Sequence, residues 1–265
     1  MCQCGEFARL GNMRLTALLI LISPAVPLSA DVCNPTALQG SYGFQLSGDT
    51  TISGEKKPVS NVGRMVLGAD GGISGYSTVM FAGLLLGNPV TGTYEANWDC
   101  TVSWSLQDDS GAFQHFSGTA TSDGKTVHFR QTDPGGAQNG TMARTSAECK
   151  ATDIKKQYSF TLSGTSTPML PGETSSRVDA KGLIQADENG NFKLTLAGAA
   201  AAATDVTIAV DAECIVDLGL VIPAKDAGTS ATPMALHGVL VEEGKKILAI
   251  QTDPGAMVTA VFTAP

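Results

Sequence analysis

The sequence predicts an all-β protein built from two tandem antiparallel barrels, and three observations support this fold class. The phrase Gln-Thr-Asp-Pro-Gly at residues 131–135 returns at residues 251–255. Short segments of alternating apolar and polar residues, separated by Gly- and Asp-rich turns, fill both halves of the chain. After residue 30 no long amphipathic helical pattern appears. A repeat of this length indicates that the same domain fold occurs twice along the chain.

The first 30 residues are typical of a secretory signal peptide. Arg14 precedes an apolar run at residues 15–26, and the small residues Ser29 and Ala30 follow. The run is too short and too interrupted by proline to span a bilayer. Met13 is an alternative start, in which case residues 1–12 would be an over-annotated extension. We therefore expect a protein that is secreted or periplasmic after cleavage, and that does not span the membrane.

Composition excludes several classes of partner. Charged residues make up 16% of the 265-residue chain, and the net charge is −8. Basic residues form no cluster, so nucleic-acid binding has no electrostatic basis. A polybasic membrane anchor is absent for the same reason. The excess of acidic over basic residues is explained by the need to keep the protein soluble.

Four cysteines remain once residues 1–30 are removed, and they allow three pairings. The repeat favours Cys33 with Cys100 and Cys149 with Cys214, one bridge per copy. Each bridge would close a loop of about 65 residues and stabilise the fold by roughly 4 kcal/mol in the chain-entropy model. The alternative is a four-cysteine metal site. Export and the lack of Cys-x₂-Cys spacing argue against that site.

Each copy contains eight strand-like segments. The first copy is expected to occupy residues 31–145, with segments at about 40–47, 61–67, 72–80, 90–97, 101–106, 113–121, 125–132 and 140–144. The second is expected to occupy residues 146–265, with segments at about 157–163, 176–186, 191–196, 205–211, 214–220, 234–241, 245–252 and 257–263. Eight short strands joined by hairpins favour an up-and-down barrel, whose interior is either filled or holds one small ligand. A two-sheet β-sandwich is the alternative.

Alternation sorts the residues of each strand into an interior and an exterior face. The predicted interior sets are Tyr42, Phe44, Leu46, Val127, Phe129 and Gln131 in the first copy, and Tyr158, Phe160, Leu162, Ile247, Ala249 and Gln251 in the second. The exterior face of one strand differs between the copies, with His128 and Arg130 in the first and Leu248 and Ile250 in the second. An apolar exterior needs cover. We expect Leu248 and Ile250 to contact the first domain or another subunit.

The repeated Gln-Thr-Asp-Pro-Gly phrase has a structural and a functional interpretation. Asp-Pro-Gly is a turn sequence, because proline fixes φ and glycine tolerates positive φ, so the phrase predicts the hairpin that closes each barrel. Its glutamines, Gln131 and Gln251, are polar groups in an otherwise apolar interior stripe and could face a cavity. With the interior tyrosines Tyr42 and Tyr158, they form our set of candidate ligand-binding residues.

No catalytic, metal-binding or cofactor-binding pattern accompanies these residues. The three histidines, His115, His128 and His237, have no partner at metal-ligand spacing and are not matched between the copies. No Gly-x-Ser-x-Gly nucleophile motif is present. We therefore predict no catalytic residue, no metal and no cofactor.

The segment from Cys33 to Gly48, with its Gly-x-Tyr-x-Phe-x-Leu-Ser-Gly pattern, resembles a group of uncharacterised secreted bacterial proteins. They share a cysteine-led first strand, a Gly-x-Tyr strand followed by Asp-Cys, and a closing Gln-Thr-Asp-Pro-Gly. The resemblance covers nearly all of residues 31–265. The second copy departs from it at Ile208 and Glu213. The resemblance implies small calycin-type barrels, similar in shape to allene oxide cyclase, and transfers no catalytic residue.

The leading functional hypothesis is a non-enzymatic module that binds a small apolar ligand or serves in surface interaction. A barrel enzyme of the cyclase or isomerase type is the first alternative, since such an enzyme can work mainly by holding its substrate in shape. A structural envelope protein is the second.

Overall fold

The computed structural model describes residues 33–52, 54–107, 113–166, 176–198, 203–223 and 231–265. The predicted signal segment lies outside these ranges. No helix in the described ranges has the length and apolar character needed to cross a bilayer.

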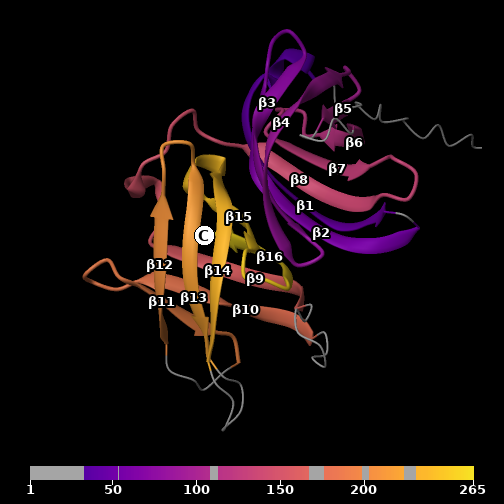
Figure 1. Ribbon diagram of the computed structural model, residues 1–265. Coiled ribbons are helices and arrows are strands. Elements are labelled where there is room, and N and C mark those ends of the chain that lie inside the picture. Colours follow the sequence, from indigo (N-terminus) through magenta and orange to yellow (C-terminus); the bar gives the residue numbers. More distant parts are fainter. Residues whose placement is uncertain (1–32, 53, 108–112, 167–175, 199–202, 224–230) are drawn as a thin grey trace, which may run out of the picture. The chain divides into compact units, whose positions relative to one another are not determined.

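The first half of the chain forms a closed antiparallel barrel (Figure 1). It follows a short 3₁₀ turn, η1 (Pro35–Leu38). Its strands are β1 (Gly40–Ile52), β2 (Glu55–Leu67), β3 (Gly72–Phe81), β4 (Leu84–Ala96), β5 (Thr101–Gln107), β6 (Phe113–Ala120), β7 (Thr126–Gln131) and β8 (Ala137–Arg144). Each strand pairs with the next, and β8 pairs back onto β1, where Phe44 lies opposite Met142.

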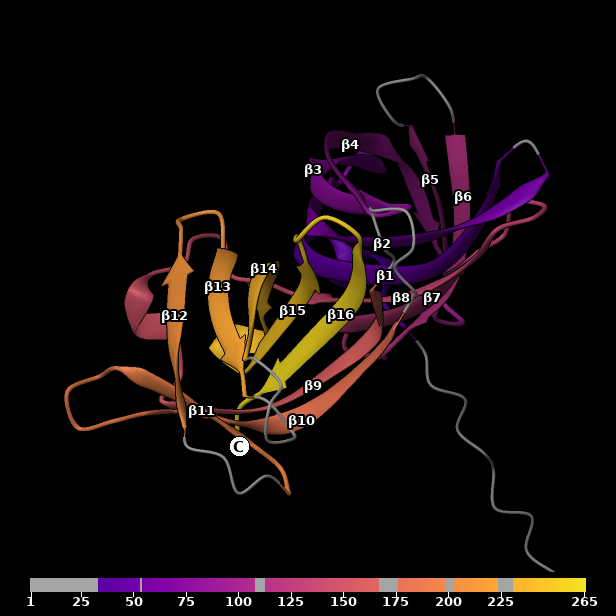
Figure 2. The same ribbon diagram turned by 60° about the horizontal axis from the view of Figure 1, so that its bottom comes forward.

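The second half repeats this topology (Figure 2). Its strands are β9 (Gln157–Ser166), β10 (Ser176–Ala186), β11 (Phe192–Leu196), β12 (Thr204–Val210), β13 (Ile215–Ile222), β14 (Thr232–Val241), β15 (Lys246–Gln251) and β16 (Ala256–Thr263), with 3₁₀ turns η2 (Ala151–Asp153) and η3 (Glu242–Gly244). The last strand returns to β9, where Phe160 lies opposite Phe262. Two eight-stranded barrels are therefore confirmed, and their closure excludes the sandwich.

The interior faces are those that alternation predicts. Tyr42, Phe44 and Leu46 are at most 4% exposed, as are Tyr158, Phe160 and Leu162. A glycine on the neighbouring strand makes room for each phenylalanine. A Cβ on Gly63 or Gly182 would lie only 3.0 Å or 2.7 Å from the ring of Phe44 or Phe160. The repeat thus extends to the way in which the core is packed.

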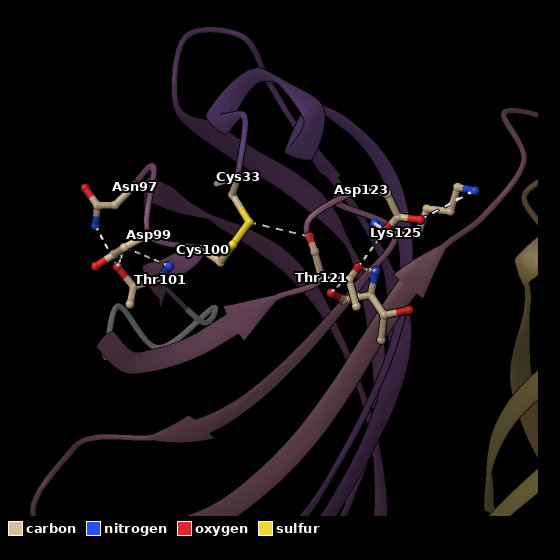
Figure 3. The surroundings of a disulfide bond; sticks show 9 residues. Cys33, Asn97, Asp99, Cys100, Thr101, Thr121, Asp123 and Lys125 are labelled. Carbon is tan, nitrogen blue, oxygen red and sulfur yellow. Dashed lines mark hydrogen bonds and ion pairs between the residues drawn. A yellow bond between two sulfur atoms is a disulfide. The ribbon is translucent and has the colours of Figure 1, made fainter. Parts of the chain in front are cut away.

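The disulfides join Cys33 to Cys100 and Cys149 to Cys214, the pairing that the repeat favoured. Figure 3 shows the first bridge beside the turn before β5, where the Asp99 carboxylate accepts hydrogen bonds from the Thr101 N–H (3.0 Å) and hydroxyl (2.6 Å). Cys100 and Cys214 both adopt left-handed backbone angles, with φ of 68° and 66°. Each bridge therefore holds the same kind of strained turn.

Two strands of the first barrel begin six residues earlier than predicted. The sequence places β2 at residues 61–67 and β4 at 90–97, whereas the strands begin at Glu55 and Leu84. Pro58 and Pro89 explain the error, because proline within a run argues against strand structure. Here both prolines lie inside paired strands, opposite Asp49 and Tyr76. The added segments extend the barrel wall at one end.

The exterior apolar face of β15 is covered as expected. Leu248 and Ile250 belong to an apolar cluster that we call the seam: Val62, Met80 and Ala143 from the first barrel, and Val239, Val241, Leu248, Ile250 and Met257 from the second. Leu248 is 3% exposed and Ile250 is fully buried. The Gln45 amide adds hydrogen bonds to the carbonyl groups of Ala249 (2.6 Å) and Ala260 (3.0 Å). The two barrels therefore contact through the surface that the sequence predicted.

Truncating the seam should cost far more stability than truncating its counterpart on the first barrel. We expect Leu248→Ala to lower the free energy of unfolding by about 2–5 kcal/mol, because it leaves a cavity between packed side chains. Arg130→Ala, at the exposed matching strand of the first barrel, should change it by less than about 0.5 kcal/mol. Urea unfolding measures both. Equal effects of the two substitutions would show that the seam is not packed.

Candidate functional site: the open end of the first barrel

The two ends of the first barrel differ in how they are filled. At one end, η1 places Leu38 in the core, and the Tyr42 hydroxyl donates to the Gly124 carbonyl at 2.5 Å. We call this the closed end. Further in, Trp104 packs on Phe116 and Phe129, with ring centroids 5.7 Å and 4.8 Å away. The opposite end, where β2 and β4 are extended, is the open end.

The open end contains a cavity of about 230 Å³. Its lining combines apolar side chains with uncharged polar ones. The polar ones are Thr50, Asn61, Ser77, Asn88, Gln107, Gln114 and Gln138, and the apolar ones are Val59, Val79, Phe81, Leu86, Pro89, Val90 and Leu106. None of these side chains is titratable. A pocket of apolar walls with a few fixed polar groups is the usual form of a small-molecule site.

Alternation along β2 places Asn61 on the interior face. It lies two residues before Gly63 and four before Met65, whose side chain is in the core. The Asn61 Oδ1 atom is fully buried and accepts no hydrogen bond from any described residue. A buried acceptor without a donor costs about 1–3 kcal/mol. Because the oxygen has no accessible surface, a donor on a bound molecule can reach it only when the Asn61 amide turns toward the cavity.

A chain of hydrogen bonds leads from the surface to the cavity wall. The Asp133 carboxylate accepts from the His115 N–H at 2.8 Å and from the Gln131 amide at 3.0 Å. The Gln131 carbonyl oxygen in turn accepts from the Gln138 amide at 2.7 Å. Gln138 is 3% exposed and lines the cavity. Because one N–H of its amide is held by Gln131, Gln138 offers its carbonyl oxygen and its second N–H to a ligand.

The pKa of Asp133 reflects these bonds. Burial by itself would raise the pKa, but the hydrogen bonds from His115 and Gln131 outweigh it and hold the pKa below the ordinary value of 3.8. The His115 ring nitrogen Nδ1 lies 2.7 Å from the second carboxylate oxygen. Asp133 therefore acts as an ionised anchor for the strands on both sides of it.

The Gln-Thr-Asp-Pro-Gly phrase is confirmed as the closing turn of each barrel. The N–H groups of Gly136 and Ala256 donate to the carbonyls of Asp133 (3.0 Å) and Asp253 (3.1 Å). Gly135 and Gly255 both have φ of 81°, which favours glycine.

The second barrel repeats part of the hydrogen-bond chain. Asp253 accepts from the Gln251 amide (2.8 Å) and from the Ala235 N–H (2.9 Å). The continuation into the cavity is missing there, because Val258 occupies the position that matches Gln138. The shared part is therefore structural, and only the first barrel connects it to polar lining groups.

Three of the cavity-lining polar residues, Asn61, Gln114 and Gln138, have apolar counterparts in the second barrel. The strand register shows that Ala180 is the counterpart of Asn61. Asn61 pairs with Leu46 in the first barrel, and Ala180 pairs with the matching Leu162 in the second. The remaining matches follow the offset of the repeated phrase: Gln114 with Met234, and Gln138 with Val258. Met234 is 6% exposed and Val258 is fully buried. At these three positions the second barrel thus has apolar side chains where the first barrel has polar ones.

The sequence-predicted site residues lie in different places. Gln131 supports the cavity wall through Gln138, and Gln251 is 7% exposed and bonded to its own turn. Tyr42 and Tyr158 are fully buried away from the cavity lining, with their hydroxyls bonded to the carbonyls of Gly124 and Gly244. Burial raises the pKa of Tyr42 to about 12. The structure therefore brings only Gln131 near the cavity.

Sequence reasoning missed Asn61, Gln114 and Gln138. Each is a polar residue at an interior position whose counterpart in the other copy is apolar. A comparison of the two copies, position by position, is the signal that could have found them.

Comparison with known proteins adds no functional argument. No protein-family model and no curated protein matches the chain. A structure of transferrin binding protein B from serogroup B Neisseria meningitidis is 6% identical to this chain and has a TM-score of 0.31. The match covers 86% of this chain and 75% of that protein's chain. The corresponding protein from Haemophilus parasuis, in mutant form, is 9% identical, with coverages of 86% and 76% and a TM-score of 0.28. A putative AttH from Nitrosomonas europaea is 8% identical, with coverages of 91% and 99% and a TM-score of 0.26. Likeness this low says nothing about ligand or role.

Because Asp133 acts as an ionised anchor, the stability that it gives to the protein depends on pH. A carboxyl whose pKa is lowered on folding stabilises the protein above its unfolded pKa, and this stabilisation is lost as the pH falls through the folded pKa. Near neutral pH, Asp133→Asn should therefore lower the free energy of unfolding by about 1–3 kcal/mol. The difference from the wild type should vanish well below pH 3.8, the ordinary value. Urea unfolding across this range checks it, with Glu188→Gln on an exposed turn as the control. A difference that persists in acid would refute an ionised anchor.

Proposed function

We propose that the protein is an exported binding protein that holds one small uncharged molecule in the open end of its first barrel. The observation that carries this proposal is a cavity lined by uncharged polar side chains, among them Asn61, Gln114 and Gln138, whose counterparts in the second barrel are apolar. Residues 31–145 and 146–265 would be its two domains. Export is supported by the two disulfides, since such bonds persist in oxidising compartments.

The lining defines the chemistry of the ligand. Amide and hydroxyl groups both donate and accept hydrogen bonds, so they suit a molecule that bears hydroxyl or amide groups of its own. With no charged lining side chain, the cavity offers nothing to offset the desolvation of an ion. Our sequence-based hypothesis of an apolar ligand is therefore replaced here by an uncharged polar one. A volume of about 230 Å³ lies below the range of drug-sized sites, which suits a small group.

Binding fits the lining better than acid–base catalysis. General acid–base catalysis needs a titratable group within hydrogen-bond reach of the substrate. The nearest such pair that we describe, His115 and Asp133, is connected to the cavity only through Gln131 and Gln138. Their role in this proposal is to position the Gln138 amide.

Exchanging the lining for its second-barrel counterpart tests the proposal. The variant Asn61→Ala/Gln114→Met/Gln138→Val should retain ligand more than about 100-fold less well, because each lost hydrogen bond in a closed site costs about 1 kcal/mol or more. Its thermal stability should change little, since removal of the unpartnered Asn61 oxygen offsets loss of the hydrogen bond from Gln138 to Gln131. The measurement is mass spectrometry of small molecules that the protein retains from an extract of its own host.

Gln185→Met, on the exposed face of β10, is the matched control and should retain the same molecules as the wild type. If the wild type retains nothing, or if the lining variant retains the same molecules, the proposal fails. A variant that loses stability instead of binding would assign a structural role to the polar groups.

A further inference from the structure

Exposed apolar side chains, which we call the rim, lie at the end of the first barrel that contains the cavity. Six large hydrophobic side chains are exposed in the part of the chain that the structure describes. Three of them, Leu84, Leu85 and Leu86, are consecutive at the start of β4, and they are 54%, 52% and 44% exposed. Phe113 begins β6, opposite Gln107 at the same end of the barrel. Four of the six exposed large hydrophobic side chains thus lie at the open end.

The interior face of β4 changes from apolar to polar to apolar along its length. Leu84 and Leu86 are exposed, Asn88 lines the cavity, and Val90 is 6% exposed at the core. Because alternate residues of a strand share one face, these four side chains form a continuous row. A molecule that enters with a polar end first would pass the leucines before it reaches the amides.

The hairpin that carries the leucines is fixed in position. Ala82 and Gly83 form its turn with φ of 49° and 84°. The Ala82 N–H donates to the Pro58 carbonyl, and the Gly83 carbonyl accepts from the Gly255 N–H, both at 3.0 Å. Gly255 belongs to the closing turn of the second barrel. The second barrel therefore helps to hold the leucines at the mouth, where apolar surface exposed to water is unfavourable unless something covers it.

Taking the proposed function as its basis, we propose that the ligand is an uncharged amphiphile. Its hydroxyl- or amide-bearing head occupies the cavity beside Asn61 and Gln138, and its alkyl portion lies against Leu84 and Leu86. The rim and the polar cavity are then two parts of one site. Molecules with a charged head are excluded, because no lining side chain compensates the charge.

Paired probes test this inference by isothermal titration of the full chain. Octyl β-glucoside and N-octylacetamide carry the chain, and methyl β-glucoside and N-methylacetamide carry the same heads without it. Each octyl compound, below its micelle concentration, should bind about ten- to fiftyfold more tightly than its short partner, which corresponds to two or three methylenes covered by the rim. Octyl sulfate and octyltrimethylammonium should not bind.

Rim variants separate this inference from the proposed function. Leu84→Ser, at a rim residue that does not line the cavity, should reduce the advantage of the octyl chain and leave the short partners unchanged, whereas Leu84→Met should keep it. Tyr76→Ser, on the exterior face of β3, is the control. Long and short probes that bind equally would overturn the amphiphile and leave the binding cavity intact.

Two further results would also overturn the inference. The first is that neither octyl probe binds, which would overturn the amphiphile. The host-extract measurement above would then decide the proposed function by itself. Binding to phosphatidylcholine vesicles that the serine variant loses, without any dependence on chain length among the soluble probes, would assign the rim to a lipid surface instead.

Discussion

Eight apolar side chains meet at the seam between the barrels, and this contact fixes the wall of the candidate site. Val62 and Met80 lie on the exterior faces of β2 and β3 and are fully buried there. The interior faces of the same two strands carry Asn61 and Ser77 of the cavity. Since successive side chains of a strand point to opposite faces, a contact that immobilises one face also positions the other. The second barrel thereby acts on a cavity to which it contributes no lining residue.

The two barrels share their turns, disulfides and supporting hydrogen bonds, and they differ in the side chains of the interior. Both have the disulfide-held turn, the tyrosine bonded to a glycine carbonyl, and the Gln–Asp hydrogen bond of the closing turn. These features stabilise a barrel whatever it contains. The interior at the open end has diverged to polar residues in one copy and apolar residues in the other. Polar groups kept inside a barrel at a cost in stability are typical of a site retained for function.

Much of the fold could be predicted from the sequence, because it depends on local pattern. Alternation identified the interior rows, and the repeat selected the disulfide pairing and exposed the unusual face of Leu248 and Ile250. The open end could not be predicted in the same way. Pro58 and Pro89 argue against the strand segments that build it, yet each lies where its strand pairs with a neighbour on one side only, as an edge proline does.

The cavity residues depend on register, which no single strand reveals. Asn61 faces inward only because β2 pairs with β1 so that it lies opposite Leu46. Gln131 was recognised because its phrase is repeated, yet its role is to hold Gln138, seven residues away in the next strand. A polar residue in an alternating segment is usually assigned to the solvent side, and pairing with its neighbours is needed to show otherwise.

Hydrogen exchange of the full-length protein tests most directly whether the seam holds the cavity wall. In Ile250→Ala, the account predicts faster exchange in β2 and β3 than in the wild type, with β5 and β6 of the same barrel unchanged, because β2 and β3 carry seam residues and β5 and β6 carry none. Protection that is unaltered in β2 and β3, or that falls equally in all strands of the first barrel, would contradict it.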